Sequence, residues 1–258
     1  MNKPLILITN DDGIQAGGIH ELALLAKKYG RVTVVAPNGP RSAQSSALTI
    51  EQPVYAINHH SEDDIQWFSC SGTPTDCVKL AITQLMPERP QLILSGINHG
   101  SNASINVIYS GTMGAVFEGC MHGIPSVGYS LLHHSLAADF SQCLPYITAV
   151  TERVLAKGLP AGVCLNINFP AKVKIEGMKV VRSARSHWNE EYQEYTDPHG
   201  HPFFWLTGRI VNDEPEATDT DLHWLGLNYA TCVPVRPDQN AIDKMAGVAS
   251  LIGEPIGL

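Results

Sequence analysis

With 258 residues, of which 44% are hydrophobic, the chain is long enough to bury the core of one large α/β domain. Its formal net charge of −8, without a run of Lys or Arg, argues against binding to duplex nucleic acid or to a membrane surface, because both require a basic face. Six scattered cysteines without a Cys-x-x-Cys pair argue against a zinc site or a disulfide framework. The chain shows no signal-peptide pattern and no apolar run long enough to span a bilayer, so we expect a cytoplasmic protein.

The first predicted strand, residues 5–8, is a short apolar run rich in β-branched side chains, which is typical of a buried strand in a parallel sheet. It breaks into an Asn-Asp-Asp-Gly sequence at residues 10–13. A helix is predicted from Gly17 to Gly30, and a second strand at residues 32–36. The sequence that follows this strand is polar and rich in turn residues, so it predicts a loop.

Strands and helices are predicted to alternate as far as residue 169. In chain order, the expected elements are strands at 54–57 and 65–69 around a turn at 59–64, a helix at 73–86 with Thr73 as its N-cap, a strand at 91–95, a helix at 113–122, a strand at 126–130, a helix at 137–157, and strands at 163–169 and 178–182. This alternation predicts an α/β fold with a doubly wound, mostly parallel sheet.

The sequence changes character after Arg182. Residues 183–215 are aromatic and polar without a helical period, which predicts hairpins or extended arms. Residues 222–235 are apolar but irregular, with one strand expected at 229–235. We expect one domain over residues 1–258, made of an α/β core at 1–182 and a C-terminal β-rich extension at 183–258.

Three polar clusters follow three of the predicted apolar strands. They are Asp11 with Asp12, Ser42 with Ser45, and Asn98 with Asn102. Each cluster alone could be ordinary loop chemistry, because these residue types dominate turns. In a parallel sheet, however, all three lie at the carboxyl ends of the strands, where open α/β sheets bind ligands. Carboxylate, hydroxyl and amide oxygens suit Mg²⁺ or Mn²⁺ and suit zinc poorly, so the pattern predicts a site for a hard divalent cation.

A fourth polar feature, Ser110-Gly111-Thr112, stands at the predicted start of a helix. Free backbone N–H groups, the helix dipole and two hydroxyls form a natural phosphate cradle there. The alternative is that Thr112 only caps the helix. A phosphate cradle opposite a divalent cation predicts phosphoryl hydrolysis, in which the metal polarises a phosphate oxygen and lowers the pKa of a bound water.

Other phosphate chemistries fit the sequence less well. A covalent phosphatase of the haloacid-dehalogenase type needs Asp-x-Asp after the first strand, and Asn10 stands where its nucleophile would be. The Gly-rich loops of P-loop proteins and of dinucleotide-binding proteins are absent from the sequence. The 11 histidines show no His-Glu-x-x-His spacing, and we assign none of them a role.

Together these residues resemble the SurE family of stationary-phase survival proteins, which are metal-dependent 5′-nucleotidases. The matching motifs are NDDG at 10–13, a form of APxxxRSGxS at 36–45, GTPTDCV at 72–78, SGINxGxN at 95–102 and YSGT at 109–112. Weaker likenesses are DPHGHPFFWLTG at 197–208 and Thr220-Asp221. The order and spacing of the motifs hold over nearly the whole chain.

The resemblance implies one divalent cation, Mg or Mn, in each subunit. Its implied ligands are Asp11, Asp12, Ser42 and Asn98. The residues implied to lie near the phosphate are Asn10, Ser42, Ser110, Gly111 and Thr112. The implied fold is a Rossmann-like α/β core with a C-terminal extension that builds a homodimer or homotetramer through swapped arms.

The sequence also departs from the family pattern. Ala43 stands where the family usually has Gly after the ligand Ser, and only Gly adopts positive φ freely. His99, Ser101, and positions 46–47 and 103–106 also differ from the commonest forms. These positions flank the expected pocket, so they leave the preferred base open and do not bear on the metal ligands.

The leading hypothesis is a metal-dependent phosphohydrolase of nucleoside 5′-monophosphates. Asp11 is the better candidate to orient or deprotonate the attacking water, with Asp12 mainly a metal ligand. One alternative is a broader phosphatase that acts on 3′-nucleotides or short polyphosphate through the same site. Another is a metal-dependent nucleotide-binding regulator without turnover. The physiological metal and the choice between dimer and tetramer stay open.

Overall fold

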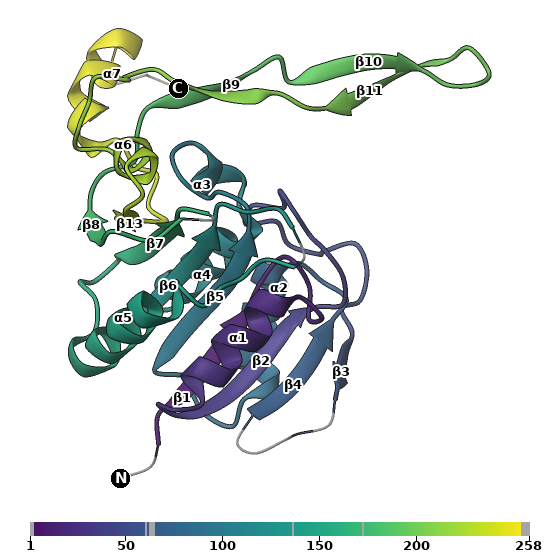
Figure 1. Cartoon of the computed structure of the whole chain (residues 1–258), viewed down its shortest axis with the longest axis vertical. Helices are drawn as coiled ribbons and strands as arrows, with labels where there is room; N and C mark the ends of the chain where they lie inside the picture. The colour runs from purple at the N-terminus through teal and green to yellow at the C-terminus, as the bar shows by residue number, and fades with distance from the viewer. Residues whose placement is uncertain (1–2, 60, 62–64, 136, 172, 254–258) are drawn as a thin grey trace.

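The computed structural model describes residues 3–59, 61, 65–135, 137–171 and 173–253. Within these ranges nine strands form one central sheet (Figure 1). In spatial order they are β3 (Ala56–Asn58), β4 (Ile65–Cys70), β2 (Arg31–Pro37), β1 (Leu5–Thr9), β5 (Leu92–His99), β6 (Ser126–Leu131), β7 (Cys164–Phe169), β13 (Ala230–Val235) and β8 (Met178–Val180). The strands from β4 to β7 run parallel, while β3 and β13 are antiparallel to their neighbours β4 and β7. The predicted doubly wound, mostly parallel sheet is confirmed.

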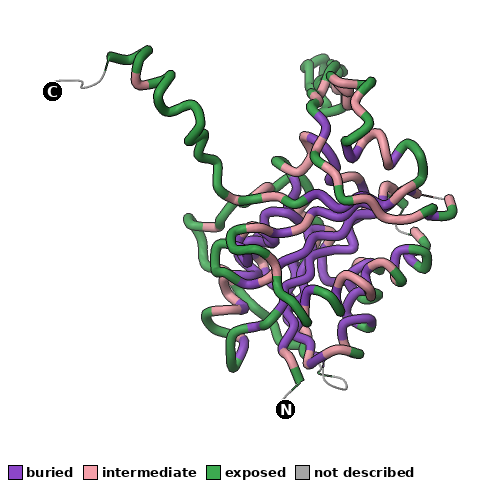
Figure 2. The backbone as a smooth tube through the Cα atoms, turned by 90° about the vertical axis from the view of Figure 1, so that its left-hand side faces the viewer, coloured by how far each residue is buried: buried purple, intermediate pink, exposed green. Residues whose placement is uncertain are grey.

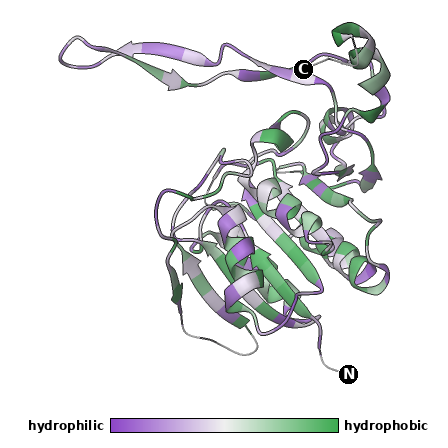
Figure 3. Cartoon of the chain, turned by 180° about the vertical axis from the view of Figure 1, so that it is seen from behind, coloured by the Kyte–Doolittle hydropathy of each residue, from purple (hydrophilic) through white to green (hydrophobic). Residues whose placement is uncertain are grey.

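Helices cover both faces of this sheet. They are α1 (Gly17–Ala26) and α5 (Leu144–Lys157) on one face, and α2 (Pro74–Leu80) and α4 (Gly111–Met121) on the other. Successive side chains of β1 point to opposite faces of the sheet, and both faces are buried. Ile6 and Ile8 pack on the α1 side, and Leu5 and Leu7 pack on the α2 side. The buried backbone and the hydrophobic residues are concentrated in the central strands (Figures 2 and 3).

The start of α2 is set by a local sequence signal. The Thr73 hydroxyl accepts a hydrogen bond from Asp76 N at 3.1 Å, and Thr73 N donates to the Asp76 carboxylate at 2.9 Å. This reciprocal capping box, with Pro74 in the first turn, confirms Thr73 as the N-cap. A π-helical turn, Ala81–Leu85, continues α2 to the predicted end before Pro87.

Several predicted boundaries are wrong, and the helix expected to reach Gly30 ends at Ala26. The helix expected at 137–157 begins only at Leu144, because Pro145 has no N–H to donate and its ring clashes with a preceding turn. Upstream, the Asp139 carboxylate bonds to Ser141 N at 2.9 Å, which offers the backbone a turn in place of a helix. Strand β5 runs to His99 rather than ending at 95, with a register shift against β6 between Ser95 and Asn98. In the turn expected at 59–64, positions 60 and 62–64 lie outside the described residues.

The C-terminal part of the chain forms an arm and returns to the sheet. Strands β10 (Tyr192–Thr196) and β11 (Pro202–Leu206) make a hairpin, and β9 (Ser186–Asn189) pairs with β12 (Arg209–Asn212) at its base. This arm projects far from the body (Figure 1), as the aromatic, polar sequence predicts. Strand β13 then enters the central sheet between β7 and β8, although it lies beyond residue 183.

Three helices in the described residues were not expected. They are the short α3 (Asn106–Tyr109), α6 (Asp221–Gly226) and α7 (Met245–Ile252). Helix α7 has no buried residue and stands away from the body (Figure 2). Every helix in the described part of the chain is too short or too polar to cross a membrane.

Candidate active site

The expected site residues gather where the order of the sheet reverses. From β1 the chain builds the sheet outward through β2 and β4, whereas from β5 it builds in the opposite direction through β6 and β7. Loops at such a switch point leave a crevice at the carboxyl ends of the strands. Asp11 and Asp12 follow β1, and Asn98 lies at the end of the adjacent β5. The two strands therefore bring the Asp pair and Asn98 to the same edge of the sheet.

Asp11 is the most buried carboxylate of this edge, with 5% of its surface exposed. Its Oδ1 accepts a hydrogen bond from the Thr112 hydroxyl at 2.5 Å. Burial raises the pKa of Asp11 from 3.8 to about 6; the Thr112 hydroxyl opposes this shift and the neighbouring Asp12 charge adds to it. Burial beside a second carboxylate therefore disfavours the ionised form of Asp11.

Asp12 is held by the next strand. Its Oδ2 accepts a hydrogen bond from His99 N at 3.1 Å, and His99 Nδ1 lies 3.1 Å from the same oxygen. The His99 ring is buried and meets Phe140 edge-on, and its Nε2 has no hydrogen-bond partner among the described residues. His99 therefore fixes the orientation of Asp12. The sequence prediction gave the histidines no role, and the available signal was the position directly after Asn98.

The two asparagines of the site have different surroundings. The Asn98 Nδ2 donates to Gly100 O at 3.2 Å and to Asn102 Oδ1 at 3.4 Å, which orients its Oδ1 away from these partners. The side chain of Asn10 is fully buried and bonds to the backbone of Gly13 through both its Nδ2 and its Oδ1. Asn10 thus shapes the turn that carries the Asp pair.

The loop after β2 approaches the Asp pair through its backbone. Arg41 N donates to Asp11 O at 2.7 Å, and the exposed Ser42 is the next residue. Further on, Ser45 N donates to Tyr109 O at 3.0 Å, which ties this loop to the end of α3. Ala43 adopts φ 58°, so the loop keeps a left-handed backbone at the position where the family usually has Gly.

The first turn of α4 closes the site from the other side. The hydroxyl of Ser110 accepts from Met113 N at 3.1 Å, so Ser110 is the N-cap, and the alternative that Thr112 only caps the helix is wrong. Thr112 instead holds Asp11. A Cβ on Gly111 would lie 2.9 Å from Asp11 Cβ and 3.1 Å from Asp11 Oδ2, so only glycine allows this close approach.

The residues present fit a hard divalent cation. Asp11 is buried next to a second carboxylate, and a divalent cation would compensate the charge of both. Within the described ranges, no three His, Cys, Asp or Glu side chains gather as metal ligands. The expected set has a different composition, because only two of its members are carboxylates and the others offer hydroxyl and amide oxygens. All-oxygen sets of this kind suit Mg²⁺ or Mn²⁺.

The fold and this edge define an α/β protein with a paired-carboxylate site at the switch point of its sheet and a helix N-terminus beside it. The model of the family described as survival protein SurE matches residues 6–190. The chain therefore belongs to the SurE family.

Relatives cover nearly the whole chain. The 5′-nucleotidase SurE of Phocaeicola vulgatus is 48% identical over 244 residues, which span 94% of this chain and 95% of the relative. The 5′-nucleotidase SurE of Christiangramia forsetii is 47% identical and covers 93% of each chain. The crystal structure of the SurE protein from Aquifex aeolicus matches with a TM-score of 0.81 and 32% identity, covering 96% of this chain and 100% of that one. These similarities extend through the C-terminal arm as well as the sheet.

Proposed function

We propose that this protein is a metal-dependent phosphohydrolase that releases phosphate from nucleoside 5′-monophosphates. The observation that carries the proposal is the buried Asp11, which lies beside Asp12 at the switch point and is held by Thr112 in the first turn of α4. In this proposal, the start of α4 binds the anion and the Asp pair beside it binds the cation. The names of relatives at up to 48% identity, 5′-nucleotidase SurE, support the same reaction.

One cation per subunit would be held by Asp11, Asp12, Ser42 and Asn98. When bound, Mg²⁺ or Mn²⁺ polarises a phosphate oxygen and lowers the pKa of a coordinated water. The carboxylates place negative charge around the cation, and the bond from His99 N to Asp12 limits the freedom of one of them.

The chain's own groups then bind the phosphate and orient the water. The backbone N–H groups at the start of α4 bind phosphate oxygens, assisted by the positive end of the helix dipole. The Thr112 hydroxyl holds Oδ1 of Asp11, so the other carboxylate oxygen is directed towards Gly111. Asp11 orients the attacking water or accepts its proton. Stabilisation of the developing charge by these fixed dipoles is the largest expected contribution.

A pocket beside Arg41 can take the nucleoside. It has a volume of about 620 Å³, and its lining is mostly polar. The lining also includes Leu48 and Ile50, both exposed to solvent, against which a base could stack. Asp76 in the first turn of α2 holds one wall of the pocket, because its carboxylate accepts a hydrogen bond from Thr49 Oγ1 at 2.6 Å. Arg41 links this pocket to the Asp pair, because it lines the pocket and its backbone N donates to Asp11 O.

The deciding experiment is phosphate release from a panel of nucleoside monophosphates with Mg²⁺, Mn²⁺ or EDTA. We expect release that requires the metal and is lost in Asp11→Asn, since the neutral amide neither accepts a proton nor compensates a cation. The same panel, extended to 3′-nucleotides and tripolyphosphate, separates a dedicated 5′-nucleotidase from the broader phosphatase. A folded wild-type protein that binds nucleotide but releases no phosphate with either metal would instead be the regulator.

A pocket variant tests where the nucleoside lies. Ile50→Ala should raise the KM for nucleoside monophosphates and leave the KM for phenyl phosphate, which has no nucleoside, unchanged. Ile57→Ala is the matched control, because Ile57 is also an exposed isoleucine but lies on β3 outside the pocket lining. Equal effects of Ile50→Ala on both substrates would place the nucleoside elsewhere.

We also propose that the protein is a homo-oligomer of the cytoplasm. The arm exposes a set of large apolar side chains, Tyr192, Tyr195, Phe203, Phe204, Trp205 and Leu206. Helix α7 is likewise apolar and has no buried residue. Unpartnered apolar surface of this kind marks interfaces, and a second copy of the chain would cover it. The six buried, free cysteines are consistent with a reducing compartment.

A further inference from the structure

The segment from residue 98 to residue 110 has a proposed site residue at each end, one for the metal and one for the phosphate. Asn98 stands at its start, and Ser110, the N-cap of α4, at its end. Near Asn98 the segment is fixed to the sheet: Asn102 N donates to Asn168 Oδ1 at 2.9 Å, and Asn166 Nδ2 donates to Asn102 O at 2.7 Å. The asparagines of β7 therefore hold the first third of the segment, and the rest needs other partners.

The middle of the segment is held by α6 and by strand β9 at the base of the arm. Ser104 N donates to the Asp221 carboxylate at 2.7 Å, and Ile105 N donates to Ser186 Oγ at 3.3 Å. Ser104 has φ 57°, a conformation that costs a non-glycine residue free energy and persists only where its surroundings impose it. Ser186 and Trp188 lie two residues apart on β9, so they face the segment from the same side of the strand.

Trp188 reaches the metal end of the segment through one intermediary. Its Nε1 donates to Asn106 Oδ1 at 3.1 Å. The Nδ2 of the same Asn106 donates back to Ser101 O at 3.0 Å. Ser101 lies between Asn98 and Asn102, so a continuous chain of hydrogen bonds runs from the arm strand to the loop that orients Asn98.

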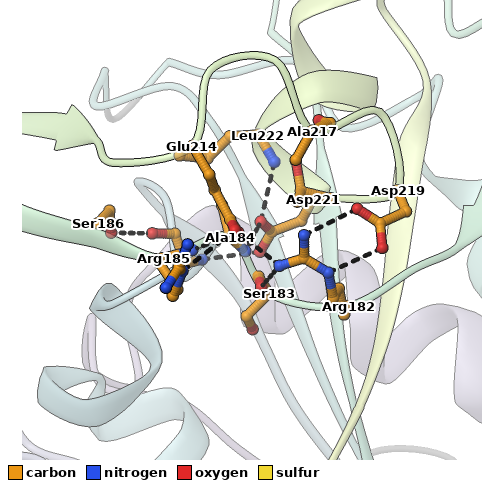
Figure 4. Close-up of polar contacts among 12 residues, drawn as sticks. Arg182, Ser183, Ala184, Arg185, Ser186, Glu214, Ala217, Asp219, Asp221 and Leu222 are labelled. Carbon is orange, nitrogen blue, oxygen red and sulfur yellow. Dashed lines mark hydrogen bonds and ion pairs between the residues drawn. The ribbon is translucent and has the colours of Figure 1, made fainter.

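Asp221 joins this segment to the arm base. It is fully buried, and its carboxylate also accepts from Ala184 N and Leu222 N, each at 2.8 Å (Figure 4). Around it, Arg182 binds Asp219 through two hydrogen bonds of 2.8 Å and also contacts Glu214. A buried carboxylate that satisfies three backbone donors from three segments fixes their relative positions, because losing it leaves buried N–H groups unpaired.

We propose that Asp221 and Trp188 are positioning residues for the metal–phosphate site, through which the base of the arm sets the geometry of residues 98–110. The inference rests on the proposed function for what the site binds, but not for the contacts themselves. If arms are exchanged between copies of the chain, the site then forms fully only when the arm is seated. Assembly and metal affinity are thereby coupled.

The test measures Mn²⁺ binding by calorimetry together with amide hydrogen exchange of residues 103–107. Trp188→Phe keeps the ring and removes only the Nε1 donor. We expect Mn²⁺ to bind about three- to tenfold more weakly, as the loss of one buried hydrogen bond predicts, with faster exchange confined to this segment. Trp205→Phe is the matched control, because Trp205 is an exposed tryptophan of the hairpin away from these contacts. Asp221→Asn should have a larger effect, since one amide oxygen replaces two carboxylate oxygens.

The outcomes separate a positioning role from a purely structural one. A folded Trp188→Phe protein that binds Mn²⁺ like the wild type overturns the inference, even if Asp221→Asn fails to fold. Faster exchange throughout the sheet with unchanged Mn²⁺ affinity also overturns it, since this would mean general destabilisation. A wild-type protein that binds Mn²⁺ but releases no phosphate from nucleotides would contradict the proposed function and leave this inference standing.

Discussion

The ionised form of Asp11, which the proposed site requires, lowers the stability of the metal-free fold. Burial raises its pKa to about 6, with a smaller contribution from the charge of Asp12. For an acid whose folded-state pKa is raised, the stabilising contribution is present below the unfolded value near 4 and is lost as pH rises through about 6. In the metal-free protein at neutral pH, the ionised carboxylate therefore costs up to about 3 kcal/mol, at 1.36 kcal/mol for each unit of pKa.

Asp11→Asn should consequently make the metal-free protein more stable while it abolishes turnover. We expect a gain of about 1–3 kcal/mol at neutral pH in EDTA that disappears near pH 4, since Asn keeps the acceptor for Thr112 without the charge. Urea unfolding at both pH values measures it. Asp139→Asn is the control: Ser141 N holds the pKa of that exposed carboxyl below its ordinary value, so this variant should give no gain. A neutral-pH stability of Asp11→Asn at or below that of the wild type would contradict the argument.

Among single residues, the sequence predicts the site residues that directly follow strands. It does not predict residues that contact the site from distant parts of the chain. Asp11 and Asp12 are adjacent to an apolar run, so their place at the sheet edge follows from local pattern. His99 reaches Asp12 across 87 residues, and Trp188 reaches Asn106 across 82. Such contacts depend on the order of strands and on the path of the arm, which no local periodicity specifies.

Among the elements, the first turn of α4 leaves little space for a larger side chain at Gly111. Gly111 is helical without positive φ, so alanine would suit its backbone and gain up to about 1 kcal/mol of helix propensity. The added Cβ, however, would lie 2.9 Å from Asp11 Cβ and 3.3 Å from Arg41 O. The clash therefore falls on Asp11 and the loop after β2, which line the proposed site, rather than on the helix.

Gly111→Ala should therefore reduce kcat/KM about ten- to a hundredfold with little change in the unfolding midpoint, because a displacement of an ångström is enough to disturb a reacting geometry. Steady-state kinetics and urea unfolding together measure both parts. Gly226→Ala at the end of α6 is the matched control, since Gly226 is also a helical glycine and a Cβ there meets open space. Near-normal kinetics in Gly111→Ala would mean that Asp11 and α4 do not act together.

Elements with strong local signals were predictable, and those decided by packing were not. Strand β1 and the capping box of α2 are confirmed because an apolar run and a Thr-Pro-x-Asp sequence each determine one structure. The start of α5 was missed because the apolar period continues upstream of Pro145, where turn-forming side chains compete. Helices α6 and α7 are too short to give a clear apolar period within the irregular C-terminal sequence.

In the whole molecule, the central sheet buries its apolar side chains, whereas the arm and α7 expose theirs. The central strands are almost wholly buried, whereas α7 exposes Met245, Val248 and Ile252, which share one face at helical spacing. An isolated helix of this length is marginal in water, so its packing partner determines whether it forms. In the oligomer that we propose, a second copy of the chain would supply an equivalent surface and close the assembly by symmetry.

Leu251→Asp should therefore shift the protein towards monomer, because burying an unpaired carboxylate in an apolar interface costs several kcal/mol. Sedimentation velocity at several concentrations measures the shift. Leu24→Asp is the matched control: Leu24 is also an exposed helical leucine, 58% accessible against 85% for Leu251, but it lies on α1 away from the C-terminal appendages. A wild-type monomer, or an equal effect of the two substitutions, would show that α7 is not the assembly surface. If Leu251→Asp also weakened Mn²⁺ binding, assembly would be linked to the geometry of the site, as the contacts of Asp221 and Trp188 lead us to expect.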